Sequence, residues 1–281
     1  MCGRSPSCHN QTAARFNKGK LVKLSVVHIN SQRGSEPYTA LVNEVFNSVK
    51  RSDTEIEHRW AKLKRATDTV FGYPYLLNAV DVIHNIAEAG QAGADGCMVA
   101  CTGDPGVIEA RTLVDVPVVG PWEASLHMAA MYGYRFGVIT VEDPAWAETC
   151  HSLVVKSGLI DKCVGVQRIS IPSGEAFTEG FANPDKVIAE LDIQARALVD
   201  KGASAICIGS AGLSTIASAG GFHRLSGLDV PVFDSLVVGL KTLETRVDLT
   251  QRGGLPPTSR SGFTTRFADE DAARVRKLFG L

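Results

Sequence analysis

Short apolar runs rich in β-branched residues alternate with longer segments whose apolar positions recur at helical spacing. The short runs are typical of strands buried on both faces, and the longer segments are typical of helices. We expect strands at residues 21–30, 97–101, 116–120, 135–141, 163–171, 205–210 and 230–234. We expect helices at residues 75–93, 108–114, 122–133, 144–158, 184–202, 235–247 and 268–280. This alternation predicts an α/β fold with parallel sheets that helices cover on both faces.

One motif occurs twice. Residues 93–103 read GADGCMVACTG, and residues 202–212 read GASAICIGSAG. Each copy runs from Gly-Ala through an apolar stretch to a nucleophile-type residue eight positions after its first glycine, Cys101 in one copy and Ser210 in the other. A second apolar, strand-like run follows each copy. The repeat predicts two pseudo-symmetric parallel-sheet domains with the active site in the cleft between them.

The repeat also suggests where the domains begin and end. We place the first α/β domain at residues 22–120 plus 233–281, and the second at residues 121–232. The helix expected at 235–247 should pack back on the first domain. Residues 1–21 contain basic side chains, no acidic ones and no apolar signal region, so we expect a flexible extension there.

Cys101 and Ser210 both stand at the carboxyl ends of predicted strands, where parallel α/β sheets bind their ligands. Two such residues at the same point of two similar halves can approach one ligand from opposite sides. This geometry suits moving a proton from one face of a carbon to the other. Thr140 ends another predicted strand and is a further candidate for contact with the ligand.

Composition narrows the class of protein. The 281 residues carry a formal net charge of −1, which favours neither nucleic acid nor an anionic membrane as a partner. The chain has seven cysteines, an odd number, with no spacing typical of a zinc site. We therefore expect reduced thiols, a cytoplasmic location, no metal, and a small-molecule substrate, with a homo-oligomer left open. The glycine-rich segment 209–221 lacks the order of a nucleotide-binding loop, so no nucleotide cofactor is expected.

Several motifs together resemble one known family. The runs ACTGDPGVIEAR, VPVVGPWEASLHMAA, FGVIT, IGSAGL and VPVFD are similar to the hydantoin and allantoin racemase branch of the aspartate/glutamate racemase superfamily. The resemblance covers most of residues 22–247. It implies two pseudo-symmetric α/β domains, a site that needs no cofactor, and one cysteine from each half as paired acid and base.

The resemblance can be carried onto individual residues. Cys101 matches the first cysteine of the family, and Ser210 stands where the second is expected. Asn30 matches the first asparagine of an Ile-Asn-Pro-Asn substrate motif. Ser31 and Gln32 replace the proline and asparagine that usually follow, which leaves the identity of the substrate open.

Backbone amides should surround both positions. Thr102 and Gly103 would present N–H groups around Cys101, and Ala211 and Gly212 would do the same beside Ser210. Such donors can hold a carboxylate or an enolate-like oxygen without a metal. They should also lower the pKa of Cys101, whose thiol we expect to be partly exposed.

Ser210 leaves four interpretations open. A hydroxyl in place of a thiol weakens the acid by about five pKa units, so its use as a base would cost about 7 kcal/mol. The chain is then an engineered Cys→Ser variant of a racemase, or a natural one-thiol decarboxylase, isomerase or lyase acting through an enolate. Otherwise it racemises weakly or with another residue as partner, or it is a non-catalytic binding protein on the same scaffold.

The remaining candidates have structural interpretations. Cys97 and Cys207 lie inside apolar strands and are interpreted as core residues. His127 has the spacing of a helix-packing residue, and His223 follows a Gly-Gly loop. Asp104 is a natural turn or helix-capping acid within the GDPG sequence.

Overall fold

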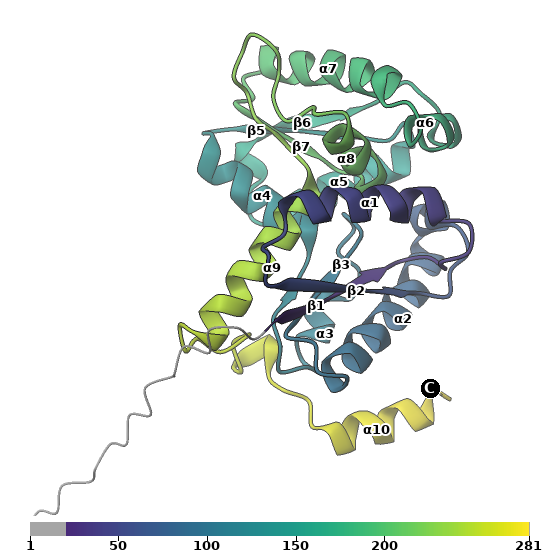
Figure 1. Ribbon diagram of the computed structural model, residues 1–281, viewed down its shortest axis with the longest axis vertical. Coiled ribbons are helices and arrows are strands. Elements are labelled where there is room, and N and C mark those ends of the chain that lie inside the picture. The colour runs from purple at the N-terminus through teal and green to yellow at the C-terminus, as the bar shows by residue number, and fades with distance from the viewer. Residues whose placement is uncertain (1–20, 281) are drawn as a thin grey trace, which may run out of the picture.

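Two four-stranded parallel sheets form the framework of the chain in the computed structural model, which describes residues 21–280 (Figure 1). The first sheet has the order β2-β1-β3-β4, with β1 (Val22–His28), β2 (Thr54–Trp60), β3 (Gly96–Val99) and β4 (Val118–Val119). The second has the order β6-β5-β7-β8, with β5 (Phe136–Thr140), β6 (Cys163–Arg168), β7 (Ala205–Ile208) and β8 (Val232–Phe233). The α/β prediction is confirmed.

The two sheets repeat the same strand order. In each, the first strand of the set pairs with the second on one side and with the third on the other, and the fourth lies beyond the third. The duplicated motif accordingly falls on β3 and β7 and on the turns that follow them. The pseudo-symmetry expected from the repeat is therefore present in the fold.

Helices surround both sheets, and short 3-10 turns connect some elements. The helices are α1 (Glu36–Val49), α2 (Gly72–Gln91), α3 (Val107–Ala110), α4 (Pro121–Tyr132), α5 (Pro144–Lys156), α6 (Ser173–Gly180), α7 (Asp185–Asp200), α8 (Ala211–Ala219), α9 (Ser235–Gln251) and α10 (Asp269–Leu278). The 3-10 turns are η1 (Ala66–Val70), η2 (Ile160–Lys162) and η3 (Gly262–Thr264). No helix within residues 21–280 is both long and apolar enough to cross a bilayer.

Apart from the 3-10 turns, one strand and three helices of the structure are not among the elements that the sequence predicts. Edge strand β2 carries charged side chains and is mostly half-exposed, so it lacks the apolar run that marks the other strands. Helix α8 is built from small residues and begins inside a glycine-rich stretch that resembles a loop. Helices α1 and α6 were also not predicted.

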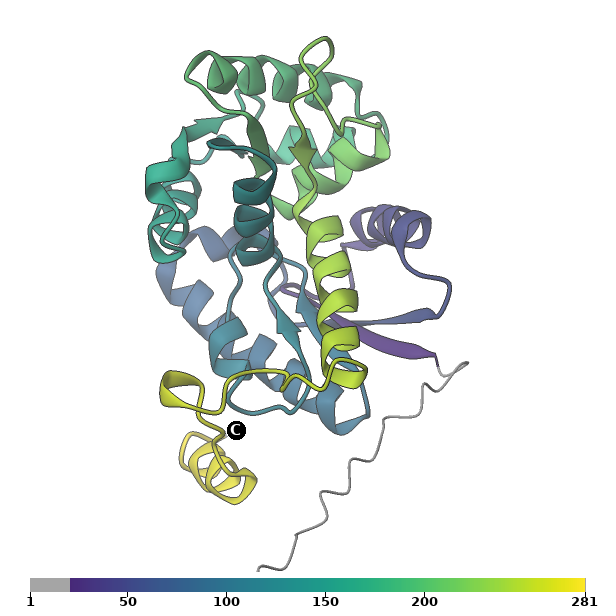
Figure 2. The same cartoon turned by 90° about the vertical axis from the view of Figure 1, so that its left-hand side faces the viewer.

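Helix α9 belongs to the core of the first sheet. Figure 2 shows it running alongside that sheet, and it contacts β3, β4, α1 and α4. Four apolar residues of α9 complete a hydrophobic cluster with β1, β3 and α1: Leu236, Leu240, Leu243 and Val247. The helix expected at residues 235–247 therefore packs on the first sheet, although its sequence follows the last strand of the second.

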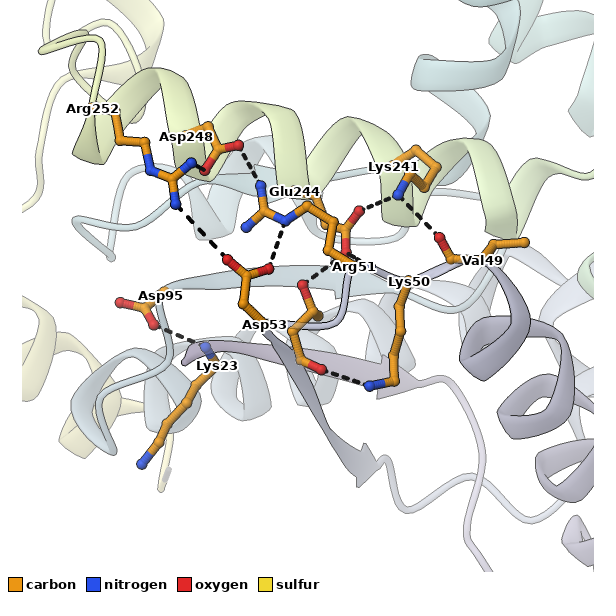
Figure 3. A network of polar contacts seen from close by, with 11 residues as sticks. Lys23, Val49, Lys50, Arg51, Asp53, Asp95, Lys241, Glu244, Asp248 and Arg252 are labelled. Carbon is orange, nitrogen blue, oxygen red and sulfur yellow. Dashed lines mark hydrogen bonds and ion pairs between the residues drawn. The ribbon is translucent and has the colours of Figure 1, made fainter. Parts of the chain in front are cut away.

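A polar network ties α9 to the loop before β2 (Figure 3). The buried Glu244 carboxylate accepts hydrogen bonds from Arg51 N–H and Thr54 Oγ1, both at 2.8 Å, and from Lys241 Nζ. Asp248, one turn further along α9, pairs with Arg51 and Arg252. Burial alone would raise the pKa of Glu244, but the bonds from Lys241, Arg51 and Thr54 outweigh it and lower that pKa.

Replacing Glu244 with alanine should lower the free energy of unfolding by about 3 kcal/mol at pH 7, because the change leaves buried donors unpaired. The folded-state pKa is depressed, so this stabilisation is complete above the usual value of 4.5 and is lost as the pH falls through the folded value. Urea titrations of both forms at pH 7 and pH 3 measure the effect. Glu148→Ala, an exposed change on α5, is the matched control. An equal loss in both variants, or a gap as large at pH 3 as at pH 7, would contradict this account.

Candidate active site

One cavity of 820 Å³ is lined by segments that follow β1, β3, β5 and β7 and by nearby helices of both halves. Cys101 and Ser210 both line it, as the repeat predicts. Asn30, Thr102, Ala211 and Gly212 also belong to its lining. Six of the eight residues expected at the site are therefore brought together, and Gly103 and Thr140 are not part of the lining.

Cys101 follows β3 in a tight turn. Its Sγ accepts a hydrogen bond from Gly103 N–H at 3.3 Å, as the amide-rich turn predicts. The expectation of a partly exposed thiol with a lowered pKa is wrong, because Cys101 is only 4% exposed. Burial raises the pKa of Cys101 to about 12, and the Gly103 amide only partly offsets it. The sequence indicates the amide donor but not the burial of the thiol.

Gly103 shapes this turn without contacting the cavity. Tyr75 Oη donates to the Gly103 carbonyl at 2.6 Å. A Cβ at Gly103 would lie 3.1 Å from both Tyr75 and Trp146, so the backbone passes closely between two rings. The turn that holds Cys101 is thus fixed by α2 on one side and α5 on the other.

Asp104 caps α4, in agreement with its expected structural role. Its carboxylate accepts from Trp122 N–H at 3.0 Å and from Glu123 N–H at 2.7 Å. Burial raises the pKa of Asp104 to about 7, against the effect of those two amides. Its negative charge also raises the pKa of Cys101, so ionisation of Asp104 near neutral pH disfavours the thiolate.

Ser210 is the N-cap of α8. Its Oγ accepts from Leu213 N–H at 3.4 Å, and the residue is 7% exposed. Ala211 and Gly212 form the first turn of that helix rather than an irregular turn, so the amide donors expected there belong to a helix N-terminus. A Cβ at Gly212 would lie 2.6 Å from Phe177, which explains the small residue.

Thr140 supports the strand end that leads to Ser210. Its Oγ1 donates to the Gly209 carbonyl at 2.8 Å, and Trp146 Nε1 donates to the same oxygen at 2.9 Å. Thr140 is fully buried, so its hydroxyl is directed at the backbone and not at the cavity. The place of Thr140 at the end of β5 was foreseen, but its hydrogen-bond partner was not.

Asn30 lines the cavity from the end of β1. Its Nδ2 donates to Ser35 Oγ, which links the strand end to the loop before α1. Ser31 and Gln32, at the positions where the family motif is altered, do not line the cavity. The altered part of the motif therefore does not reach the site.

Sequence reasoning missed several residues of the lining. Tyr38 and Phe177 belong to helices that were not predicted, and Trp146 belongs to the helix predicted at residues 144–158. The others lie in connecting segments, and they are Lys64, Arg65, Glu142 and Phe181. The two acidic side chains of the lining have other partners: Glu142 accepts from Ser173, and Asp143 caps α5. For Tyr38 and Phe177, the only feature of the sequence that could have indicated them is an aromatic residue within a short amphipathic segment.

The other candidates lie outside the cavity. Cys97 and Cys207 are fully buried within strands, which confirms their interpretation as core residues. His223 is exposed, and so is His127, whose expected packing role is therefore wrong. Within residues 21–280, no group of three or more histidine, cysteine or acidic side chains is arranged to hold a metal ion.

A duplicated α/β framework thus surrounds one cavity whose volume is typical of small-molecule sites. Residues 26–243 match the family described as Asp/Glu/Hydantoin racemase. A hydantoin racemase from Pseudomonas sp. (strain NS671) is 32% identical over 232 residues, which cover 82% of this chain and 88% of that relative.

Solved structures agree with this match. An allantoin racemase from Klebsiella pneumoniae aligns with a TM-score of 0.73 at 27% identity, covering 88% of this chain and 94% of the other. An allantoin racemase from Pseudomonas fluorescens, 22% identical with a TM-score of 0.66, has the same fold; the alignment covers 88% of this chain and 97% of the other. The chain therefore belongs to the Asp/Glu/hydantoin racemase family, and it is an enzyme of the isomerase class.

Proposed function

We propose that this protein is a cofactor-independent racemase of hydantoin-like compounds, with Cys101 as its thiol acid/base and Ser210 at the opposite position. The observation that carries the proposal is the meeting of Cys101 and Ser210 in one cavity at the ends of equivalent strands. The hydantoin and allantoin racemases described above support this substrate class. The proposed substrate is a small cyclic or carboxylated compound with an acidified α-hydrogen.

The chemistry needs no added group. A hydantoin ring acidifies the hydrogen on its α-carbon because the resulting carbanion is an enolate of the adjacent carbonyl. Cys101 removes or returns that proton through its sulfur, and amide donors in the cavity hold the enolate oxygen. The α8 N-terminus at Ala211 and Gly212 is one source of such donors.

The buried thiol gives the reaction a definite pH dependence. Only the thiolate of Cys101 can accept a proton, and the raised pKa leaves the group protonated near neutral pH. The exchange rate should therefore rise by about tenfold for each pH unit while the pH remains below that pKa. A plateau that begins near pH 8 would show that the working thiol is an ordinary one.

Ser210 favours a second candidate, a one-thiol decarboxylase, isomerase or lyase that passes through an enolate. The Ser210 hydroxyl already accepts a bond as a helix cap, and a serine is a far weaker acid than a cysteine. Such an enzyme needs only Cys101 to transfer a proton to or from one face of the enolate, so it requires no second base. The same scaffold without catalysis would be a binding protein.

Solvent deuterium incorporation, followed by NMR, tests the assignment. The panel contains 5-substituted hydantoins as separate enantiomers, allantoin, and α-substituted malonates, each with an enzyme-free control. We expect exchange into one hydantoin enantiomer, with slow formation of the other. Decarboxylation of a malonate without hydantoin exchange would favour the second candidate. Binding with no exchange on any compound would refute both.

A further inference from the structure

Tyr38 joins the two halves of the molecule at the cavity. It lies in the first turns of α1, which packs against α8 of the second half (Figure 1). Its ring meets Phe181, just after α6, at a centroid distance of 5.8 Å. Tyr38 and Phe181 both line the cavity. Tyr38, a residue of the first half, therefore contacts the second half at the cavity that Ser210 and Ala211 also line.

The Tyr38 ring rests on a pair of hydrogen-bonded histidines. It contacts His28 edge-on at 5.9 Å, and His28 is hydrogen-bonded to His58 at 2.8 Å. His58 in turn is bonded to Asn43 at 2.7 Å. Burial, followed by the charge of His58, lowers the pKa of His28 to about 3, so no positive charge forms beside Tyr38 at neutral pH. His28 and His58 therefore support the Tyr38 ring and form no hydrogen bond with its hydroxyl.

The Tyr38 hydroxyl is buried and has no hydrogen-bond partner among the described residues. An unpaired buried hydroxyl is unfavourable by about 1–3 kcal/mol. Burial raises the pKa of Tyr38 above 10, and the acidic groups of Cys101 and Asp234 raise it further. The group is thus a phenol at every working pH, close enough to Cys101 to respond to its charge, and able to donate a hydrogen bond.

We propose that Tyr38 is a further catalytic residue, whose hydroxyl donates a hydrogen bond to the enolate oxygen that forms when Cys101 takes the α-proton. This inference rests on the proposed function. The hydroxyl keeps its own proton throughout, and the only proton that moves is the one between the α-carbon and the Cys101 sulfur. A neutral donor held near the site strengthens its bond as negative charge develops on that oxygen.

Replacing Tyr38 with phenylalanine tests the role by deuterium exchange. Loss of one donor to an oxyanion should lower kcat by about 10²-fold and leave KM nearly unchanged. The melting temperature should stay constant or rise, because the change removes an unpaired buried hydroxyl. Tyr134→Phe, at a residue that is 83% exposed, is the control and should match the parent protein. Full exchange by Tyr38→Phe would overturn the proposal, and so would a falling melting temperature that accounts for the lost activity.

A binding measurement keeps the test independent of turnover. Barbiturate is an enolate at neutral pH, whereas 5,5-dimethylhydantoin is neutral and has no α-hydrogen to lose. Tyr38→Phe should weaken barbiturate binding by about tenfold and change dimethylhydantoin binding by less than twofold. Equal affinity of both forms for barbiturate would overturn the role of Tyr38 while leaving Cys101 chemistry intact. A parent protein that binds barbiturate through Tyr38 but exchanges no proton would instead refute the proposed function.

A double variant separates hydrogen-bond donation from proton transfer. Suppose that Tyr38 transferred the second proton in place of the missing cysteine. Tyr38→Phe would then lower kcat very little in the Ser210→Cys protein, because the new thiol would transfer that proton. With the role proposed here, Tyr38→Phe keeps its full kcat penalty in the Ser210→Cys protein. Disappearance of the penalty in that protein would overturn the donor role.

Discussion

Replacing Ser210 with cysteine should raise the rate of racemisation by about 10⁵-fold. A serine hydroxyl is a weaker acid than a thiol by about five pKa units, which corresponds to about 7 kcal/mol in the barrier to proton transfer. Ser210 already lines the same cavity as Cys101. The new sulfur would occupy the N-cap of α8, where amide donors favour a thiolate.

Deuterium incorporation and polarimetry on both enantiomers of a 5-substituted hydantoin measure this effect. Ser173→Cys is the matched control, because it adds a thiol to the same cavity lining at the start of α6. That variant should gain nothing, since Ser173 does not occupy the position equivalent to Cys101. If the Ser210→Cys protein gains no racemisation on any hydantoin, the chain is a one-thiol enzyme or a binding protein.

Replacing Cys101 with serine should lower α-proton exchange by at least about 10³-fold, to the level of the enzyme-free control. The substitution preserves the shape of the side chain within the turn, and the Gly103 amide can still donate to it. Stability should therefore change little. The loss should appear in kcat, because the sulfur is the proton carrier and is not the main binding contact.

Cys163→Ser provides the control for this experiment. Cys163 is half-buried at the start of edge strand β6 and is not part of the cavity lining. The exchange rate of that variant should equal that of the parent. If Cys101→Ser retains exchange, Cys101 is not the proton carrier. The assignment of the fold and the family would not be affected.

Apolar periodicity predicted the framework because the central strands are buried on both faces. Strand β7 shows this clearly, since all four of its residues are buried and form one apolar run. Strand β2 gave no such signal, because edge strands keep a mixed pattern that a loop can also show. Similarly, α8 gave no clear signal because glycine, serine and threonine interrupt its alanines, and it packs into the core through Leu213, Ile216 and Ala217.

The position of the candidate site was predictable, but its electrostatics were not. The repeat alone placed Cys101 and Ser210 at equivalent strand ends, and both line the cavity. The pKa of Cys101 depends on desolvation by α2, α5 and other elements distant in sequence, so a local motif suggested a shift in the wrong direction. Tyr38 was missed for the same reason, because its contacts with Phe181 and His28 exist only in the folded chain.

The packing of α9 on the first sheet has a consequence for the growing chain on the ribosome. Strands β1, β3 and β4 are synthesised early, yet one apolar face of their sheet is completed only by Leu236, Leu240, Leu243 and Val247. All four strands of the second sheet leave the ribosome before α9 does. We therefore expect the second sheet to assemble first during translation, while the first remains open to chaperones until residue 251 has emerged.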